Sequence, residues 1–286
     1  MIGIDYAAVD GDAAPDLAAA IAAGVRFAII RGSYERWPDP TCARDRDAIR
    51  TAGLTYGAYM FALPGPAHPT PEEQVATFEA GAHLNPGQDL PAVIDIEFPG
   101  KGIAATGLSR VELAAWIGRA VAELERRFGC KPMVYTSARV LDDVDADCLA
   151  GAADAALAEC PLWLARYALA TRQPGRLDAD GIPLPPLPRI AGAMLWAHQY
   201  QGDAVRVPGF NATVDLSRWF PLGIGEAGAR VQWVHSRLGA AALTPGANEA
   251  GVGAAVRAYQ AAHGLTADGV IGPATFARLA WEQPAE

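Results

Sequence analysis

Short apolar runs that alternate with amphipathic segments are the feature of this sequence that most constrains its fold. A run of about four to eight apolar, β-branched or aromatic residues is typical of a buried strand, whereas apolar positions spaced three and four apart are typical of a helix. We expect eight strands, at Ile2–Asp5, Phe27–Arg31, Tyr56–Phe61, Pro91–Glu97, Met133–Thr136, Leu162–Arg166, Met194–Ala197 and Thr213–Leu216. Helices separate the early strands and loops separate the late ones. The sequence therefore predicts an α/β protein whose eight strands close into a (β/α) barrel.

The expected helices carry recognisable start signals. Segments at Pro15–Ala23 and Arg44–Ala52 follow the first two strands. Thr70 and Ser109 each precede a glutamate at the third helical position, which is the pattern of a capping box. The helix after Ser109 is the clearest, and Gly129 is suited to end it because glycine adopts the left-handed conformation that follows many helices.

The charge and hydropathy of the chain exclude several classes of partner. Its 286 residues carry a formal net charge of −9, and an acidic chain repels phosphates, so we expect no nucleic-acid partner. No run approaches the roughly 18 to 20 apolar residues of a membrane span, so we expect no membrane insertion. The start, Met1–Tyr6, lacks the basic and apolar regions of a signal peptide. We therefore expect a cytoplasmic chain, export that does not use such a signal, or a chain whose signal has been removed.

Cysteine and histidine are too scattered to indicate a metal centre. The cysteines form no Cys-x-x-Cys pair, and no histidine lies in a His-Glu-x-x-His motif. We expect no metal ion and no organic cofactor. Four cysteines in a chain of this length do not make a disulfide framework, so we expect free thiols at Cys42, Cys130, Cys148 and Cys160.

Four acidic residues lie at or near the ends of expected strands. Asp95 and Glu97 are two apart on one strand, so their side chains share a face. Neighbouring carboxyl groups in a partly dry cleft push each other's pKa values apart, which gives the acid and the negative group that glycosidic cleavage needs. A bare Asp-x-Glu is also common by chance, as two solvent-facing acids. Asp5 and Asp215 strengthen the interpretation, because the active face of such a barrel is formed at its strand ends.

Aromatic and basic side chains surround the same strand ends. Aromatic rings pack against the apolar faces of sugars, and an arginine can pair with a carboxylate and hold it ionised. Each residue has a plain alternative, since single aromatics most often pack in a core and an arginine can simply lie at the surface. The candidate substrate-binding residues are Tyr59, Phe61, Tyr135, Trp163, Tyr167, Trp196, Tyr200, Arg31 and Arg166.

Eight short motifs follow one another over roughly residues 1–220. They are Ile2-Gly-Ile-Asp5, Phe27-Ala-Ile-Ile-Arg31, Ala52-Gly-Leu-Thr-Tyr-Gly-Ala-Tyr-Met-Phe61, Ala92-Val-Ile-Asp-Ile-Glu97, Val134-Tyr-Thr-Ser137, Leu162-Trp-Leu-Ala-Arg-Tyr167, Leu195-Trp-Ala-His-Gln-Tyr200 and Val214-Asp-Leu-Ser-Arg-Trp219. Each motif is modest alone, but their order is specific, and in this order they resemble the glycoside hydrolase family 25 lysozymes. The resemblance implies an irregular barrel whose late strands lack helices. It also implies an N-acetylmuramidase, which cuts the β-1,4 bond between N-acetylmuramic acid and N-acetylglucosamine.

The resemblance also implies roles for single residues. Glu97 matches the general acid, and Asp95 matches the carboxylate that assists the substrate's acetamido group or stabilises the charged intermediate. Asp5 and Asp215 match the other two acids of the cleft, and Asp215 is a candidate to orient or activate water. Gln199, in the seventh motif, joins the substrate-binding candidates. After its first aspartate the family usually shows serine and then glutamine before glycine, whereas this chain reads Tyr-Ala-Ala-Val-Asp-Gly, so contacts of the first loop are expected to differ.

A smaller helical unit follows the barrel. The glycine-rich stretch Pro221–Gly228 reads as a boundary, whereas the proline-rich stretch Gly181–Pro188 reads as a surface loop. We expect a barrel domain at residues 1–222 and a three-helix domain at residues 228–282. The run Gly264–Thr275 resembles the signature of the peptidoglycan-binding three-helix domain, and a purely stabilising appendage is the alternative. Candidate wall contacts are Tyr259, Asp268 and Gly269.

These patterns predict a monomeric peptidoglycan hydrolase that acts at the cell wall, released as a phage lysin or exported by a bacterium. A non-catalytic wall-binding protein is the alternative, and it would be favoured if Asp95 or Glu97 were missing. A metal-dependent amidase would need clustered histidine, cysteine or aspartate ligands, which the sequence does not show.

Overall fold

The computed structural model describes residues 1–10, 14–97, 102–137, 140, 154–167, 194–205, 207–220, 222, 228–238 and 249–282. Three sequence predictions fall outside these residues: the thiol of Cys148, the loop at Gly181–Pro188 and most of the boundary at Pro221–Gly228. The other three cysteines are buried free thiols. Within the described ranges, no helix combines the length and apolar character needed to cross a membrane.

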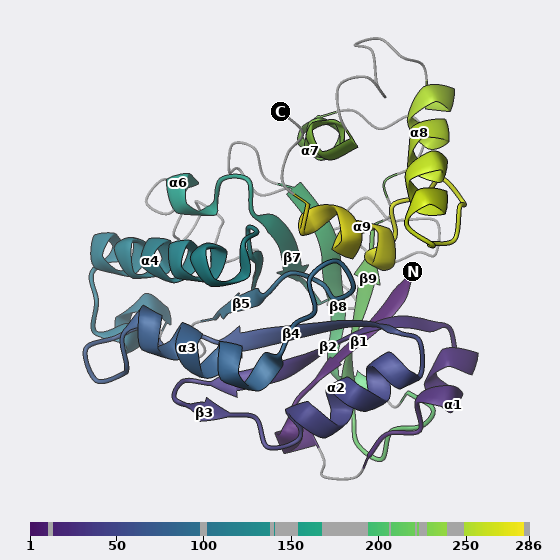
Figure 1. Ribbon diagram of the computed structural model, residues 1–286. Helices are drawn as coiled ribbons and strands as arrows, with labels where there is room; N and C mark the ends of the chain where they lie inside the picture. Colours follow the sequence, from purple (N-terminus) through teal and green to yellow (C-terminus); the bar gives the residue numbers. More distant parts are fainter. Residues whose placement is uncertain are drawn as a thin grey trace.

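Eight strands close into a barrel, which confirms the predicted fold class (Figure 1). Each of these strands pairs with two neighbours within the ring, and β1 pairs with both β2 and β9 to close it. All eight expected strands therefore lie in one sheet. In ring order they are β1 (Ile2–Tyr6), β2 (Val25–Tyr34), β4 (Thr55–Phe61), β5 (Val93–Ile96), β6 (Met133–Ser137), β7 (Pro161–Ala165), β8 (Met194–Val205) and β9 (Val214–Trp219).

The barrel is irregular at its last strand. The other ring strands run parallel to their neighbours, whereas β9 is antiparallel to both β8 and β1. A parallel neighbour needs a crossover of about a dozen residues or more, and the connection from Val205 to Val214 is shorter than that. As a result β9 starts, rather than ends, at the carboxyl end of the parallel strands. This direction places Asp215 directly opposite Asp5.

Helices cover the outside of the early strands. Two of them, α3 (Pro71–Ala82) and α4 (Arg110–Phe128), begin at the predicted capping boxes of Thr70 and Ser109. Gly129 ends α4 with a φ of 74°, as its position after the helix predicted. The remaining elements of this region are α1 (Leu17–Ala22), α2 (Cys42–Thr51), α6 (Asp154–Leu157) and the 3-10 helices η1 (Ala8–Asp10) and η2 (Gly102–Thr106).

Alternation along each strand divides the buried residues between two sides of the barrel wall. On the outer side, Ile94 belongs to one buried cluster with Phe78 of α3 and Ile117 of α4. Its neighbour Val93 belongs to a second cluster, which contains Trp163 and other residues of the barrel interior. Successive side chains of a strand point to opposite faces, so a single strand contributes residues to both clusters.

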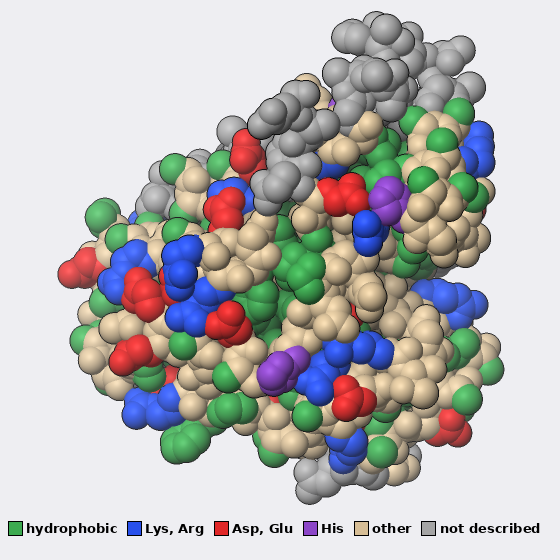
Figure 2. All heavy atoms as spheres, viewed as in Figure 1, with side chains coloured by type: hydrophobic (Ala, Val, Ile, Leu, Met, Phe, Trp, Pro, Cys, Tyr) green, Lys and Arg blue, Asp and Glu red, His purple; other side chains and the backbone are tan. Residues whose placement is uncertain are grey.

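Opposite charges are mixed on the outer face that α3 and α4 present. Figure 2 shows basic and acidic side chains side by side over these two helices. Arg119 of α4 is paired with Glu72 of α3 at 2.6 Å, and Arg127 of α4 contacts Glu79 of α3. Exposed pairs of this kind each contribute little stability, on the order of 1 kcal/mol or less. This face carries no block of one charge sign, so the acidic excess of the chain is not concentrated there.

The C-terminal helices share a hydrophobic core with the barrel. They are α7 (Ala229–Leu238), α8 (Glu249–Ala262) and α9 (Pro273–Ala280), and they lie at one end of the barrel in Figure 1. The ring of Phe276 in α9 lies 4.6 Å from Trp196 of β8 and 5.0 Å from Trp219 of β9. Trp219 also contacts Phe27, near the start of β2. The helices therefore close the end of the barrel at which the parallel strands begin.

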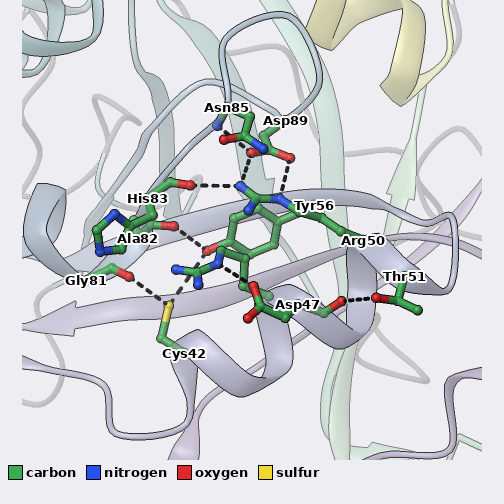
Figure 3. A network of polar contacts seen from close by, with 11 residues as sticks. Cys42, Asp47, Arg50, Thr51, Tyr56, Gly81, Ala82, His83, Asn85 and Asp89 are labelled. Carbon is green, nitrogen blue, oxygen red and sulfur yellow. Dashed lines mark hydrogen bonds and ion pairs between the residues drawn. The ribbon is translucent and has the colours of Figure 1, made fainter.

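A polar network fixes the loop beside the end of α9 (Figure 3). Asp89 is buried, and it accepts hydrogen bonds from the guanidinium of Arg50 and from the backbone N–H of Asn85. The same guanidinium donates to the carbonyl oxygen of His83 at 2.7 Å. Trp281, directly after α9, donates its indole N–H to the carbonyl oxygen of Asp89 at 2.7 Å. The C-terminal unit is thus attached to the barrel both through its core and through this loop.

Candidate active site

A pocket at the carboxyl end of the parallel strands is lined by most of the predicted site residues. Alternate positions of β1, β4, β5, β6 and β7 point into the barrel, which brings side chains from distant parts of the sequence together. The pocket contains all four predicted acids, and six of the ten predicted substrate contacts line it. The lining residues are Asp5, Ala7, Asp10, Arg31, Tyr59, Phe61, Asp95, Glu97, Tyr135, Trp163, Gln199 and Asp215.

Asp95 and Glu97 occupy different depths of the pocket. Asp95 lies within β5 and is 5% exposed, whereas Glu97 follows the strand and is only partly buried. Burial raises the pKa of Asp95, and the neighbouring Glu97 and Asp5 raise it further. Burial also raises the pKa of Glu97, the hydroxyl group of Tyr135 lowers it, and the charge of Asp215 raises it. Both carboxyl groups are therefore biased toward the protonated form, as expected for acids taken out of water.

The oxygen atoms of Asp95 are incompletely satisfied. Its Oδ1 atom is buried and has no hydrogen-bond partner among the described residues. A buried polar atom without a partner costs free energy, on the order of 1–3 kcal/mol. Such an atom in a pocket is available to a donor that arrives with a ligand, and in its protonated form the group could itself donate.

Asp5 and Asp215 face each other across the β1–β9 pair. Gln199 on β8 bridges them, because its amide nitrogen donates to Asp5 at 2.6 Å and to Asp215 at 3.0 Å. Ser217 donates to the second oxygen of Asp5 at 3.3 Å and accepts the indole N–H of Trp163 at 2.9 Å. Burial raises the pKa of Asp5, and the charge of Asp215 raises it further. The two carboxyl groups are thus held in place by donors that are themselves fixed.

The amide of Gln199 has all four of its hydrogen-bonding positions occupied. In addition to the two carboxylates, its Oε1 atom accepts from the hydroxyl groups of Tyr135 at 2.6 Å and Tyr167 at 2.7 Å. The side chain is 1% exposed. Gln199 was predicted as a substrate contact, and it lines the pocket, but two carboxyl groups and two hydroxyl groups occupy its hydrogen-bonding positions. We therefore describe it as a positioning residue.

Asp39 is a second positioning residue, and sequence reasoning missed it. It is buried and paired with the guanidinium of Arg31 at 2.9 Å. Its oxygens also accept the backbone N–H of Ala8 at 3.2 Å and of Thr41 at 3.0 Å. Arg31 in turn lowers the pKa of Asp95, which partly opposes the effect of burial. No motif marks Asp39, because its role depends on the hairpin that brings it back beside β2.

The sequence matches a known enzyme family over most of the barrel. The profile of glycosyl hydrolases family 25 matches residues 4–207, which is more than half of the chain. The chain belongs to glycosyl hydrolases family 25. A second profile, described as a putative peptidoglycan binding domain, matches residues 228–279 of this family 25 chain.

Similar proteins include a curated muramidase and a solved lysozyme. An N,O-diacetylmuramidase from Chalaropsis sp is 30% identical over 126 residues, which are 43% of this family 25 chain and 60% of that protein. An uncharacterized Escherichia coli protein, YegX, is 30% identical over 194 residues, which are 68% of this chain and 58% of that protein. The bacterial lysozyme from Streptomyces coelicolor has a similar structure, with a TM-score of 0.60 at 22% identity, over 80% of this chain and 94% of that one. The chain spans about six tenths of the curated relatives it matches, and the solved structure supports the fold alone.

Trp196 does not reach the pocket of this family 25 chain. Its side chain is fully buried against Phe276, in the core shared with the C-terminal helices. It faces the barrel interior at the end that the C-terminal helices close, and a register shift between β7 and β8 pairs Trp163 with its neighbour Ala197. Of the two tryptophans, Trp163 of β7 lines the pocket and Trp196 of β8 does not, which alternation along each strand alone would not distinguish.

Three other predicted contacts lie beside the pocket rather than in its lining. Tyr167 is half exposed and reaches the site through its hydroxyl group. The ring of Tyr200 lies 5.8 Å from the guanidinium of Arg218. The carbonyl oxygen of Arg166 lies 2.9 Å from Nε2 of His198. Tyr167 and Arg166 both contact Gln199 of the pocket lining, Tyr167 through its hydroxyl group and Arg166 through its backbone N–H at 2.9 Å.

The first loop, where the sequence departs from the family pattern, adds an acid to the pocket. Asp10 is in the lining, and its carboxylate accepts the backbone N–H of Ala7 at 2.7 Å. Sequence reasoning noted the altered loop without singling out this side chain. In the described part of the chain, no three histidine, cysteine or acidic side chains are arranged to hold a metal ion.

Proposed function

We propose that this chain is an N-acetylmuramidase that hydrolyses the β-1,4 bond between N-acetylmuramic acid and N-acetylglucosamine in peptidoglycan. The observation that carries the proposal is the convergence of Asp5, Asp95, Glu97 and Asp215 in one pocket walled by aromatic rings. Membership of family 25 and the muramidase relative support the same reaction. The alternative, a non-catalytic wall-binding protein, is less well supported because both acids of the central pair are present and enclosed.

Glu97 is the proposed general acid. Burial raises its pKa, which favours the protonated form that an acid needs, and its partly open position suits contact with a glycosidic oxygen. In the reaction the bond between C1 of the muramic acid and the bridging oxygen breaks, and that oxygen takes the proton of Glu97. Water then adds its hydroxyl to C1 and returns a proton to Glu97. Acid catalysis of this kind contributes about 10²–10⁴-fold to the rate.

Asp95 is the proposed supporting carboxyl. Its unpartnered Oδ1 atom can accept the N–H of the substrate's acetamido group, which orients the acetamido oxygen toward C1. The same carboxylate can instead stabilise positive charge that develops on the sugar ring. Arg31 partly opposes the rise in the pKa of Asp95, which acts toward the ionised form that either role uses.

Asp5 and Asp215 form the far wall of the proposed cleft. Gln199 and Ser217 hold Asp5, and Gln199 also holds Asp215, so the two carboxyl groups keep their positions without a ligand. Asp215 is the more exposed of the two and is the proposed residue for orienting the attacking water. The substrate contacts that we propose are the lining residues Arg31, Tyr59, Phe61, Tyr135 and Trp163.

The C-terminal helices are proposed to retain the enzyme on the cell wall. A binding module raises the effective concentration of an enzyme on an insoluble polymer, and the match to a putative peptidoglycan binding domain supports this role. Of the candidate contacts, Asp268 and Gly269 shape a turn. Asp268 accepts the side-chain amide of Gln260, and the backbone N–H of Gly269 donates to the same side chain. Tyr259 is the remaining candidate for contact with the wall.

Mass spectrometry of digested peptidoglycan tests the proposed reaction. Purified walls are incubated with the protein, and the soluble products are reduced and identified. New reducing ends on N-acetylmuramic acid are expected. Reducing ends on N-acetylglucosamine, or released peptides with intact glycan, would show that a different bond is cut.

A further inference from the structure

Three aromatic side chains form a row that leads out of the pocket. Phe61 of β4 lines the pocket, and Tyr34 of β2 is its partner in the neighbouring strand. Their rings are stacked, with centroids 5.0 Å apart and planes 24° apart. Trp37 belongs to β3 (Trp37–Pro38), a short strand that the sequence did not predict, and it pairs directly opposite Tyr34. Residues that are directly opposite in an antiparallel pair share a face, so the row continues from Phe61 through Tyr34 to Trp37.

The row becomes more exposed with distance from the pocket. Phe61 is partly buried, Tyr34 is 39% exposed and Trp37 is 62% exposed. Scattered exposed apolar residues are ordinary, but two large aromatic side chains side by side at the mouth of a pocket form a continuous surface. The guanidinium of Arg31, also in the pocket lining, lies 5.7 Å from the ring of Tyr34. Tyr34 is therefore joined to the pocket through two of its lining residues.

The turn that presents this row is held in an unfavourable backbone conformation. Glu35, between Tyr34 and Trp37, has a φ of 55°, a region that costs a residue with a side chain about 1 kcal/mol or more. Its carboxylate lies 3.1 Å from His68 and 2.9 Å from the guanidinium of Arg36, and its backbone N–H donates to Phe61. These contacts hold the tight turn in place. The turn is what sets the two exposed rings opposite each other.

We propose that Tyr34 and Trp37 form a saccharide-binding platform that extends the pocket, on which further sugar rings of the bound glycan strand stack. The proposal rests on the proposed function, since it assigns the occupant of the row as the continuation of the same substrate. Neighbouring strands are about 4.8 Å apart, so the row across β4, β2 and β3 extends roughly 10 Å beyond the pocket wall. Flat aromatic faces suit the apolar faces of sugar rings, and the row is continuous with the pocket in which the cleaved bond would lie.

Kinetics on long and short substrates test the platform. The measurement is the ratio of kcat/KM for peptide-free glycan strands of many disaccharides to kcat/KM for the shortest soluble oligosaccharide that the wild type cleaves. We expect Trp37→Ala to lower this ratio by about tenfold, as the loss of one stacked ring would. Trp37→Phe should recover most of the ratio, because it keeps an aromatic face. Val111→Ala is the matched control, since Val111 is 75% exposed on α4 and lies outside the pocket lining.

The possible outcomes separate this inference from the proposed function. If Trp37→Ala leaves the ratio within twofold of wild type, or lowers it no more than Val111→Ala does, the platform is overturned while the muramidase proposal stands. If the wild type cleaves neither substrate, the proposed function fails instead. Analytical ultracentrifugation of wild type and Trp37→Ala addresses a second copy of the chain as occupant. A dimer that Trp37→Ala dissociates would overturn the saccharide assignment.

Discussion

Replacement of Phe276 by alanine tests whether the C-terminal helices are part of the barrel's folding unit. The side chain is fully buried, and its ring contacts Trp196 and Trp219 of the barrel and Trp233 of α7. Removal of a buried phenylalanine side chain costs about 3–5 kcal/mol, because apolar contacts are lost and a cavity remains. For a chain of this size that loss corresponds to a fall in Tm of about 10 °C.

The assay uses one signal for each end of the barrel. Tryptophan fluorescence reports the shared core, and residual wall-degrading activity after heating reports the pocket at the other end of the barrel. We expect Phe276→Ala to lower both midpoints together, and Val111→Ala to leave them nearly unchanged because that side chain is exposed. A barrel transition that stays at the wild-type temperature while only the helices melt would refute the shared core. It would indicate that the C-terminal helices fold independently of the barrel.

Three further changes probe the electrostatics of the pocket. Gln199→Leu removes both N–H donors to the Asp5 and Asp215 carboxylates, so kcat/KM should fall by about tenfold or more with an unchanged circular dichroism spectrum. Tyr135→Phe removes the hydroxyl group that lowers the pKa of Glu97, so the alkaline limb of the pH–rate profile should move to higher pH; a limb that stays in place or moves down contradicts this. Asp95→Asn should raise Tm at neutral pH, because the raised pKa of this carboxyl means that its ionisation destabilises the fold as pH rises. That gain should disappear below about pH 4, where the unfolded chain is also protonated, and its persistence there would point to another cause.

The strands of the barrel could be predicted because each is a short apolar run bounded by turn or capping residues. The acids at Asp5, Asp95 and Glu97 followed from the same pattern, since the carboxyl ends of parallel strands form one face. Asp215 reached that face by another route. Because β9 runs antiparallel to its neighbours, Asp215 lies near the start of its strand. A rule that looks only at the carboxyl ends of parallel strands would not place Asp215 at this face.

Side-chain direction and long-range contacts could not be predicted in the same way. Trp196 was expected in the pocket and lies instead in the barrel interior at the opposite end, against Phe276 of α9, a contact that no local pattern in the sequence indicates. The roles of Asp39 and Gln199 depend on partners that are distant in sequence or on neighbouring strands. The strand β3 carries no glycine or asparagine turn signal, since its turn is formed by Glu35 and Arg36.

Replacement of Glu97 by glutamine tests the central claim most directly. The amide keeps the shape of the side chain and removes the proton that the reaction needs. The measurement is the rate at which new N-acetylmuramic acid reducing ends appear in purified peptidoglycan, with Tm and wall binding recorded for the same preparation. We predict a fall of at least about 100-fold with Tm and wall binding retained. A rate within a few-fold of wild type would contradict the assignment of Glu97 as the general acid.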